Sequence, residues 1–135
     1  MAEVAAAVTD THPLVFHLAG GRKLGRRAAA HFAACERREA VVYVPVVVVW
    51  EISLLVRAGR VPLDGSFRQL CETLFSNPAY QPLEVTVEHV LLAHESGPNN
   101  DPFDALICAA ARALDLPLLT KDADIHDSGL VNVVW

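Results

Sequence analysis

The chain has 135 residues, of which 53% are hydrophobic and 20% charged, and its formal net charge is −5. This length and composition predict one folded domain over residues 1–135 and exclude extensive disorder. The net negative charge argues against a general nucleic-acid-binding surface, but a local basic patch can still bind phosphate.

Strand and helix patterns alternate along the sequence. In chain order we expect strands over residues 4–9, 41–44, 83–85, 116–119 and 131–134, and helices over residues 11–19, 27–39, 46–58, 66–76, 86–96 and 101–114. Strands that alternate with helices at this spacing form βαβ units and a mostly parallel sheet. The expected fold class is therefore α/β.

Local signals conflict in the segment after Pro45. Four consecutive valines, residues 46–49, favour a strand. A proline suits the first position of a helix, however, and Trp50 and Leu54 continue the apolar pattern at helical spacing. We therefore expect a helix from about residue 46, with Glu51 on its second turn among apolar neighbours.

The helix of residues 101–114 has the clearest start signal in the chain. Asp101 is a suitable N-cap, and Pro102 follows at the first helical position. Five apolar residues at helical spacing predict its buried face: Leu106, Ile107, Ala110, Ala111 and Leu114.

Three widely spaced cysteines, Cys35, Cys71 and Cys108, form no CxxC pair. An odd number of thiols on apolar stretches indicates reduced, packed side chains. The first ten residues include Glu3 and lack the basic start of a secretory signal, and no apolar run reaches the roughly 18–20 residues that span a bilayer. We therefore expect a cytoplasmic protein with no membrane segment.

Four carboxylates lie at element ends or in apolar surroundings: Asp10, Glu51, Asp104 and Asp122. Right-handed parallel connections bring the strand ends before Asp10 and Asp122 to one edge of the sheet, and the helix start bearing Asp104 faces that edge. Clustered carboxylates cannot all ionise without a counter-charge. Mg²⁺ prefers oxygen ligands and supplies that charge, so the sequence predicts a metal site that can act on a phosphate.

Basic residues gather in two places that are candidate phosphate contacts. The cluster Arg22, Lys23, Arg26 and Arg27 comes before the second helix, and Lys121 lies between Thr120 and Asp122. A solvated helix start explains the cluster about as well as a phosphate-binding patch does, and Lys121 also fits an ordinary exposed lysine. Contacts of this kind to phosphate would weaken as salt is added.

The chain resembles PIN-domain ribonucleases of the VapC toxin type, from bacterial toxin–antitoxin pairs. Four segments in the family's order and spacing carry the resemblance, namely TDTHPLVFHL, WEISLLV, DPFDALICAAA and LLTKDADI. The resemblance implies a PIN-like three-layer α/β/α sandwich, RNA cleavage that depends on Mg²⁺ or Mn²⁺, a small antitoxin partner and a homodimer. Many relatives carry Ser or Thr a few residues before the second acid, where this chain has valines.

The resemblance also implies roles for individual residues. Asp10, Glu51, Asp104 and Asp122 match the family's acidic quartet, which holds metal and is catalytic. Three accessory positions accompany them: Asp101 beside the third motif, Thr120 before the fourth acid, and Asp124, whose role is open. Asp101 also fits a plain helix cap.

Three other function classes remain as alternatives. A phosphoacceptor receiver domain places its Thr and Lys on successive strands, whereas Thr120 and Lys121 are adjacent here. A phosphohydrolase with an Asp nucleophile needs a DxD after the first strand, and this chain has Asp10-Thr11-His12. The third is a catalytically silent PIN-like module that binds RNA or protein, against which the intact acidic quartet argues.

Overall fold

The computed structural model describes residues 4–135, so Glu3 lies outside the described part. Within it, five parallel strands form one sheet in the order β3-β2-β1-β4-β5. The strands are β1 (Ala5–Thr9), β2 (Ala40–Pro45), β3 (Tyr80–Leu83), β4 (Leu118–Leu119) and β5 (Val133–Val134). The helices are α1 (Thr11–Leu18), α2 (Arg26–Glu36), α3 (Val46–Arg57), α4 (Phe67–Ser76), α5 (Val87–Glu95), α6 (Pro102–Leu114) and α7 (Ala123–Ser128).

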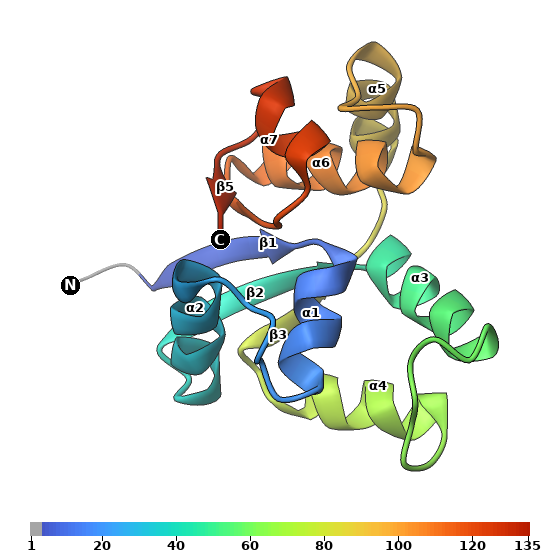
Figure 1. Cartoon of the computed structure of the whole chain (residues 1–135). Helices are drawn as coiled ribbons and strands as arrows, with labels where there is room; N and C mark the ends of the chain where they lie inside the picture. Colours follow the sequence, from blue (N-terminus) through green and yellow to red (C-terminus); the bar gives the residue numbers. More distant parts are fainter. Residues whose placement is uncertain (1–3) are drawn as a thin grey trace.

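The helices cover both faces of the sheet, which makes the three-layer α/β/α sandwich that the family resemblance implied. Figure 1 shows α5, α6 and α7 on one side, and α1, α2 and α4 on the other. The chain runs from β1 through β2 to β3 in one direction, then returns to place β4 on the other side of β1. The loops after β1 and β4 therefore diverge, and the gap between them is the topological switch point of an α/β sheet.

Small residues fill the centre of the core. β1 is mostly alanine, a poor strand former in isolation, yet it lies in the middle of the sheet between β2 and β4. The face of α6 that packs near β1 is also small, with Ala109, Ala110 and Ala111 buried. Burial of close-packed backbone thus outweighs intrinsic propensity in β1. Leu114, which we expected on the buried stripe, is 39% exposed at the end of α6.

The valine run resolves as a helix, as predicted. Pro45 ends β2 and is the N-cap of α3, with φ −55° and ψ 140°. Val48 and Ile52 are the buried residues of α3. Because Pro45 lacks an N–H and fixes φ, the strand ends there and the valines enter the helix despite their β propensity.

Several boundaries and one element differ from the sequence prediction; β4 and β5, for example, each begin two residues later than predicted. β3 covers residues 80–83 rather than 83–85, and includes Pro82, which an edge strand paired on one side tolerates. The second helix ends at Glu36, three residues before the predicted end. The six-residue α7 was not predicted. It begins after Asp122, whose side chain accepts a hydrogen bond from the Ile125 N–H at 3.1 Å.

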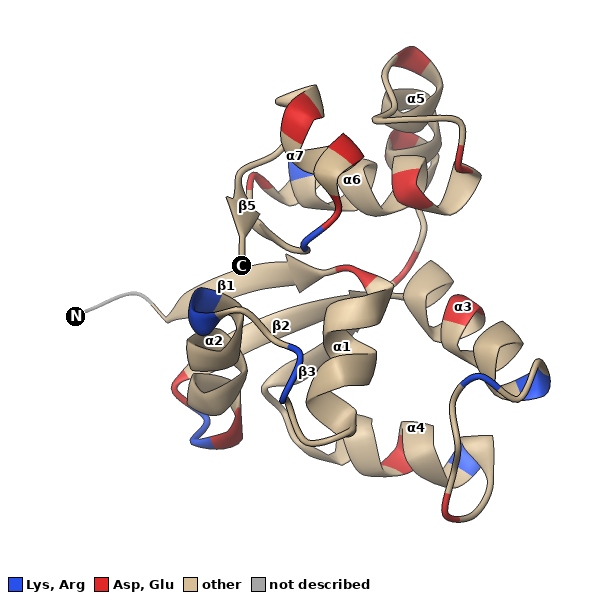
Figure 2. Ribbon diagram, in the orientation of Figure 1, with Lys and Arg blue, Asp and Glu red and all other residues tan. Residues whose placement is uncertain are grey.

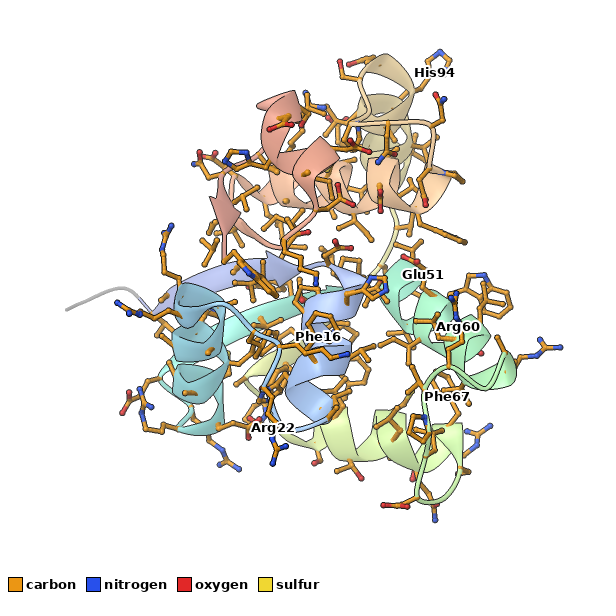
Figure 3. All side chains as sticks on the ribbon, in the orientation of Figure 1. Phe16, Arg22, Glu51, Arg60, Phe67 and His94 are labelled. Carbon is orange, nitrogen blue, oxygen red and sulfur yellow. The ribbon has the colours of Figure 1, made fainter. Side chains whose placement is uncertain are left out.

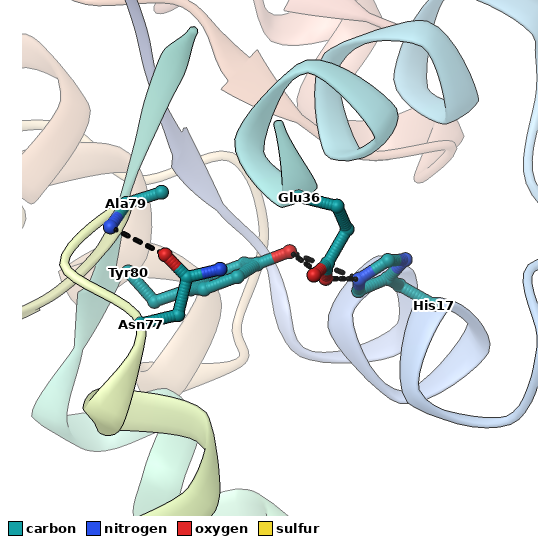
Figure 4. A network of polar contacts seen from close by, with 5 residues as sticks. All are labelled: His17, Glu36, Asn77, Ala79 and Tyr80. Carbon is teal, nitrogen blue, oxygen red and sulfur yellow. Dashed lines mark hydrogen bonds and ion pairs between the residues drawn. The ribbon is translucent and has the colours of Figure 1, made fainter. Parts of the chain in front are cut away.

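A polar network joins α1, α2 and β3 (Figure 4). The Tyr80 hydroxyl donates to Oε1 of Glu36 at 2.8 Å, and Nε2 of His17 lies 2.7 Å from the same oxygen. The His17 ring stacks on buried Phe32, with ring centres 4.5 Å apart and an interplanar angle of 7°. The hydrogen bonds from His17 and Tyr80 lower the pKa of Glu36. His17 is thus a partly buried residue at the edge of the core.

All three cysteines are free, and Cys35 and Cys108 are buried, as expected for packed thiols. Burial raises the pKa of both buried thiols to about 12, which keeps them protonated and unreactive. Within residues 4–135, no helix is long and apolar enough to span a membrane.

Candidate metal and nuclease site

The carboxyl ends of β1 and β4 bring Asp10 and Thr120 together. β1 pairs with β4 so that Thr9 lies opposite Leu119, and the Asp10 N–H donates to the Leu119 carbonyl at 3.0 Å. Each strand ends at that point, so the next side chains project from the same edge. Asp122 follows two residues after Thr120, and its N–H donates to Oγ1 of Thr120 at 3.1 Å.

Asp10 is held by two donors although it is only 7% exposed. The Thr11 N–H donates to its Oδ1 at 2.8 Å, and the Thr120 hydroxyl donates to its Oδ2 at 2.7 Å. Asp10 is also the N-cap of α1. Burial raises the pKa of Asp10, while these hydrogen bonds lower it in part. The geometry fixes both carboxylate oxygens before any ligand is bound.

Glu51 is connected to Asp10 through Thr11. The Thr11 hydroxyl, 1% exposed, donates to Oε1 of Glu51 at 2.8 Å. Glu51 reaches this point because α3 packs against α1, and Figure 3 shows it pointing towards the start of α1. Burial raises the pKa of Glu51, and the charge of Asp10 adds to the effect. Glu51 is therefore partly buried and held by Thr11 rather than simply facing solvent.

The start of α6 supplies a second acidic group. Asp101 caps this helix by accepting from the N–H groups of Phe103 and Asp104 at 2.8 and 3.2 Å, so its cap role is confirmed. The Asn99 side-chain amide donates to Oδ2 of Asp104 at 2.9 Å and to Oδ2 of Asp124 at 3.4 Å. Asn99 thus holds the acids of two separate helices.

The site carries an excess of negative charge. Burial raises the pKa of Asp104 to about 6, and the charges of Asp10, Asp101 and Asp122 contribute. No Lys or Arg forms an ion pair with these acids among residues 4–135. In that part of the chain, no three His, Cys, Asp or Glu side chains lie close enough together to hold a metal ion as they are placed. The quartet therefore surrounds a shared negative region rather than a closed cage.

The donor set fits a hard divalent cation. The side chains at the switch point are carboxylates and hydroxyls, and oxygen is the ligand that Mg²⁺ and Mn²⁺ prefer. Mg²⁺ usually keeps several waters and uses only one or two carboxylates, so a closed cage is not required. Asp10 and Asp104, which come from β1 and α6, are the residues best placed to hold such an ion, with Glu51 and Asp122 beside them.

The predicted basic residues lie in three places. Figure 2 shows basic segments in the loop after α1 and at the start of α2, and acidic segments on α5, α6 and α7. Arg22 and Lys23 line a groove of about 860 Å³ that runs along α1, α3 and α4. Arg26 and Arg27 are exposed in the first turn of α2 and do not line this groove. Lys121 lies over Phe16, with its Nζ 5.0 Å from the ring centre.

Sequence reasoning missed three residues at this edge: Thr11, Asn99 and Phe16. Thr11 directly follows the first acid, at the first position of a helix, where a hydroxyl can turn to a neighbouring element. The side chain of Asn99 accepts a hydrogen bond from the Asp101 N–H at 2.8 Å. The Asn-Asn-Asp-Pro sequence is typical of such a local turn and was the signal that could have indicated it. Phe16 carried no sequence signal beyond a place on an apolar helix.

Comparisons with known proteins agree with the fold. The chain resembles VapBC2 from Rickettsia felis bound to a promoter DNA fragment, with 12% identity, a TM-score of 0.65, and coverage of 95% of this chain and 96% of that one. It resembles FitAcB from Neisseria gonorrhoeae with 18% identity, a TM-score of 0.63, and coverage of 94% and 95%. For VapBC-5 from Mycobacterium tuberculosis the identity is 22%, the TM-score 0.57, and the coverage 96% and 98%.

At these identities the solved structures establish a shared fold. No curated protein sequence matches the chain. The family model for the PIN domain matches residues 7–129, which include all four carboxylates of the switch-point site. The chain belongs to the PIN domain family.

Proposed function

We propose that this protein is a metal-dependent endoribonuclease that hydrolyses RNA phosphodiester bonds with Mg²⁺ or Mn²⁺. The observation that carries the proposal is the unpaired negative charge at the switch point, where burial raises the pKa of Asp10, Glu51 and Asp104. An acidic site acts on an anionic substrate only through a cation. Membership of the PIN family supports the same reaction class.

In this proposal, one set of residues holds the metal and a second set positions the first. Asp10, Glu51, Asp104 and Asp122 hold the metal directly or through water, and Thr11, Thr120 and Asn99 keep three of these acids in place. A bound divalent ion supplies activation of water and stabilisation of charge on the phosphate. Asp101 orients α6 by capping it. Asp124 is an accessory acid that shares the amide of Asn99 with Asp104.

The test is cleavage of a mixed pool of structured RNAs in Mg²⁺, Mn²⁺ or EDTA. Asp10→Asn and Asp104→Asn should each abolish cleavage, because each removes a charge from the site while keeping its shape. Asp115→Asn is the matched control. Asp115 ends α6 with φ 53°, a conformation that Asn also adopts, and it precedes β4 at the opposite edge of the sheet. This control should cleave like the parent protein.

Metal-independent cleavage, or full activity in folded Asp10→Asn protein, would contradict the proposal. Absence of cleavage by folded wild-type protein under every metal condition, together with RNA binding, would favour the catalytically silent binding module instead. A metal titration by calorimetry on wild type and Asp10→Asn separates loss of the ion from loss of chemistry.

We further propose that the protein is the toxin of a toxin–antitoxin pair and acts in the cytoplasm. The fold similarity to structures described as VapBC and as toxin–antitoxin complexes supports this. Expression of the wild-type chain should arrest bacterial growth, whereas Asp10→Asn should not. Co-expression of the small protein encoded beside it should restore growth and form a complex. Growth arrest by the inactive variant would contradict the toxin assignment.

A homodimer is proposed on the same basis, with apolar surface to support it. Val87, Val90 and Leu91 of α5 are 76%, 52% and 50% exposed, and Trp50 of α3 is 49% exposed. Exposed apolar residues gathered on a helix face are typical of an interface. Sedimentation velocity should show a dimer for the parent and a monomer for Leu91→Lys; an unchanged monomeric parent would contradict this expectation.

A further inference from the structure

The chain has only two lysines, Lys23 and Lys121, and both lie over the ring of Phe16. Their Nζ atoms are 5.5 and 5.0 Å from the ring centre. Lys23 comes from the loop after α1 and Lys121 from the turn between β4 and α7, so nearly a hundred residues of sequence separate them. The fold therefore collects two cations on one aromatic ring.

Neither lysine has a carboxylate partner. No ion pair within residues 4–135 includes Lys23 or Lys121, although Lys121 directly precedes Asp122. Two ammonium groups near one ring repel each other. Such an arrangement is relieved when an anion binds between or beside the cations.

Phe16 lies near the acidic edge of the sheet, since Lys121, which directly precedes Asp122, lies over its ring. It is on α1, the helix that Asp10 caps, and it is only half-buried. Figure 3 shows Phe16 on the outward side of α1, with Arg22 in the loop that follows. Phe16, Arg22, Lys23 and His12 line one part of the groove of about 860 Å³, which has space for a nucleobase. An aromatic ring, flanking cations and an adjoining hollow thus occur together beside the metal site.

We infer that Phe16 is a stacking platform for an unpaired nucleobase of the RNA substrate, with Lys23 and Lys121 at the flanking phosphates. The inference rests on the proposed ribonuclease function. Aromatic side chains bind single-stranded RNA by stacking on splayed-out bases, and cations beside them bind the backbone. A paired base inside a duplex cannot reach such a ring. The platform therefore selects single-stranded segments or loops next to the cleaved bond.

The test measures binding of a fluorescein-labelled, mixed-sequence single-stranded RNA of ten nucleotides and of its duplex. Asp10→Asn protein in MgCl₂ is the parent, so that binding is read without cleavage. Phe16→Leu should weaken single-strand binding about 10-fold or more, the loss expected for one stacked base. Phe16→Trp should retain or improve binding. Phe67→Leu, a half-buried phenylalanine at the start of α4, is the matched control and should bind like the parent.

The salt dependence of RNA binding distinguishes the contribution of the two lysines from that of the Phe16 ring. Lys23→Ala or Lys121→Ala should reduce the slope of log affinity against log salt by about 0.7, the value for one phosphate of a single strand. Phe16→Leu should leave that slope unchanged. Arg37→Ala, which removes an exposed cation paired with Glu39 at the end of α2, should also leave it unchanged. Melting temperatures of all variants check that they are folded.

Three outcomes would overturn the platform while leaving the nuclease proposal intact. These are equal RNA binding by Phe16→Leu and the parent, equal weakening by Phe16→Leu and Phe16→Trp, and equal affinity of the parent for single strand and duplex. Loss of antitoxin binding alone in Phe16→Leu would assign the ring to the protein partner instead and would also overturn the inference. Failure of the ribonuclease proposal looks different, because it is read from cleavage: the folded wild type then does not cleave under any metal condition, whether or not the parent binds RNA.

Discussion

Thr120 and Asp10 are joined by a 2.7 Å hydrogen bond from the Thr120 hydroxyl to Oδ2 of Asp10. The two residues follow neighbouring parallel strands, and both are buried. Burial raises the pKa of Asp10, and this bond opposes that rise because it stabilises the ionised carboxylate.

Replacement of Thr120 by valine should raise the pKa of Asp10 further. The acid limb of the pH–rate profile should move to higher pH, and the rate at pH 7 should fall about 10- to 100-fold, as for other groups that orient metal ligands. Loss of a buried hydrogen bond to a charged group should also lower the free energy of unfolding by about 1.5–3 kcal/mol. Thr120→Ser keeps the hydroxyl, so an unchanged profile for valine, or an equal shift for serine, would contradict this role.

Thr11→Val should separate Glu51 from Asp10. The Thr11 hydroxyl is lost as a donor to Glu51, while the Thr11 N–H still binds Asp10. We expect a roughly 10-fold or greater loss of cleavage, because a freed Glu51 is no longer oriented. Thr11→Ser should recover most of the activity. Single-turnover rates measure the effect, and equal rates for valine and serine would show that the hydroxyl has no positioning role.

Asn99→Asp tests whether an amide is needed between two acids. The substitution keeps the oxygen that accepts from the Asp101 N–H but replaces the donor to Asp104 with another carboxylate. The added negative charge should raise the pKa of Asp104 above its value of about 6 and move the activity profile to higher pH. Asn100→Asp, at the exposed neighbouring position, adds the same charge and is the control. Identical profiles for both variants would exclude a specific role for Asn99.

The metal-free protein should lose stability as pH rises from about 4 to about 6. Burial raises the pKa of Asp104 from 3.8 to about 6, so the folded state binds more protons than the unfolded state across this interval. The free energy of unfolding then falls with increasing pH. If the folded site binds Mg²⁺ as proposed, Mg²⁺ should restore the loss at pH 7. Urea unfolding in EDTA and in MgCl₂ measures both effects, and Asp104→Asn should flatten the dependence.

Tyr80→Phe should have the opposite dependence on pH. Hydrogen bonds from His17 and Tyr80 lower the pKa of Glu36 from 4.5, so their stabilisation is present above about that pH and is lost as pH falls through the lowered value. The variant should therefore lose about 1 kcal/mol at pH 7 and less at pH 3. Tyr43→Phe, in β2, is the control, since the Tyr43 hydroxyl has no hydrogen-bond partner among the described residues. Equal losses at both pH values would argue against the Glu36 contact.

Local signals in the sequence were sufficient for most elements of the fold. Helix starts depend on a few neighbouring residues and can therefore be predicted from the sequence. Examples are the Asp101 cap and the following proline of α6, and the Ser66 cap of α4. The alternation of strands and helices implied the parallel sheet. The short α7 escaped prediction because its first turn depends on Asp122, a residue that we considered only as a site acid. The shift of β3 towards Tyr80 depends on pairing with β2, which is a property of the sheet.

The sequence by itself placed Asp10 and Asp122 at one edge of the sheet, because the parallel strands before them end there whatever the details of packing. Only the tertiary structure decided how the acids of the site are held. The bond from Thr11 to Glu51 joins side chains 40 residues apart, and the bond from Thr120 to Asp10 joins side chains 110 residues apart. Lys23 and Lys121 likewise meet over Phe16 only when α1 packs beside the end of β4. Periodicity reports the face of an element, whereas such contacts depend on how separate elements pack together.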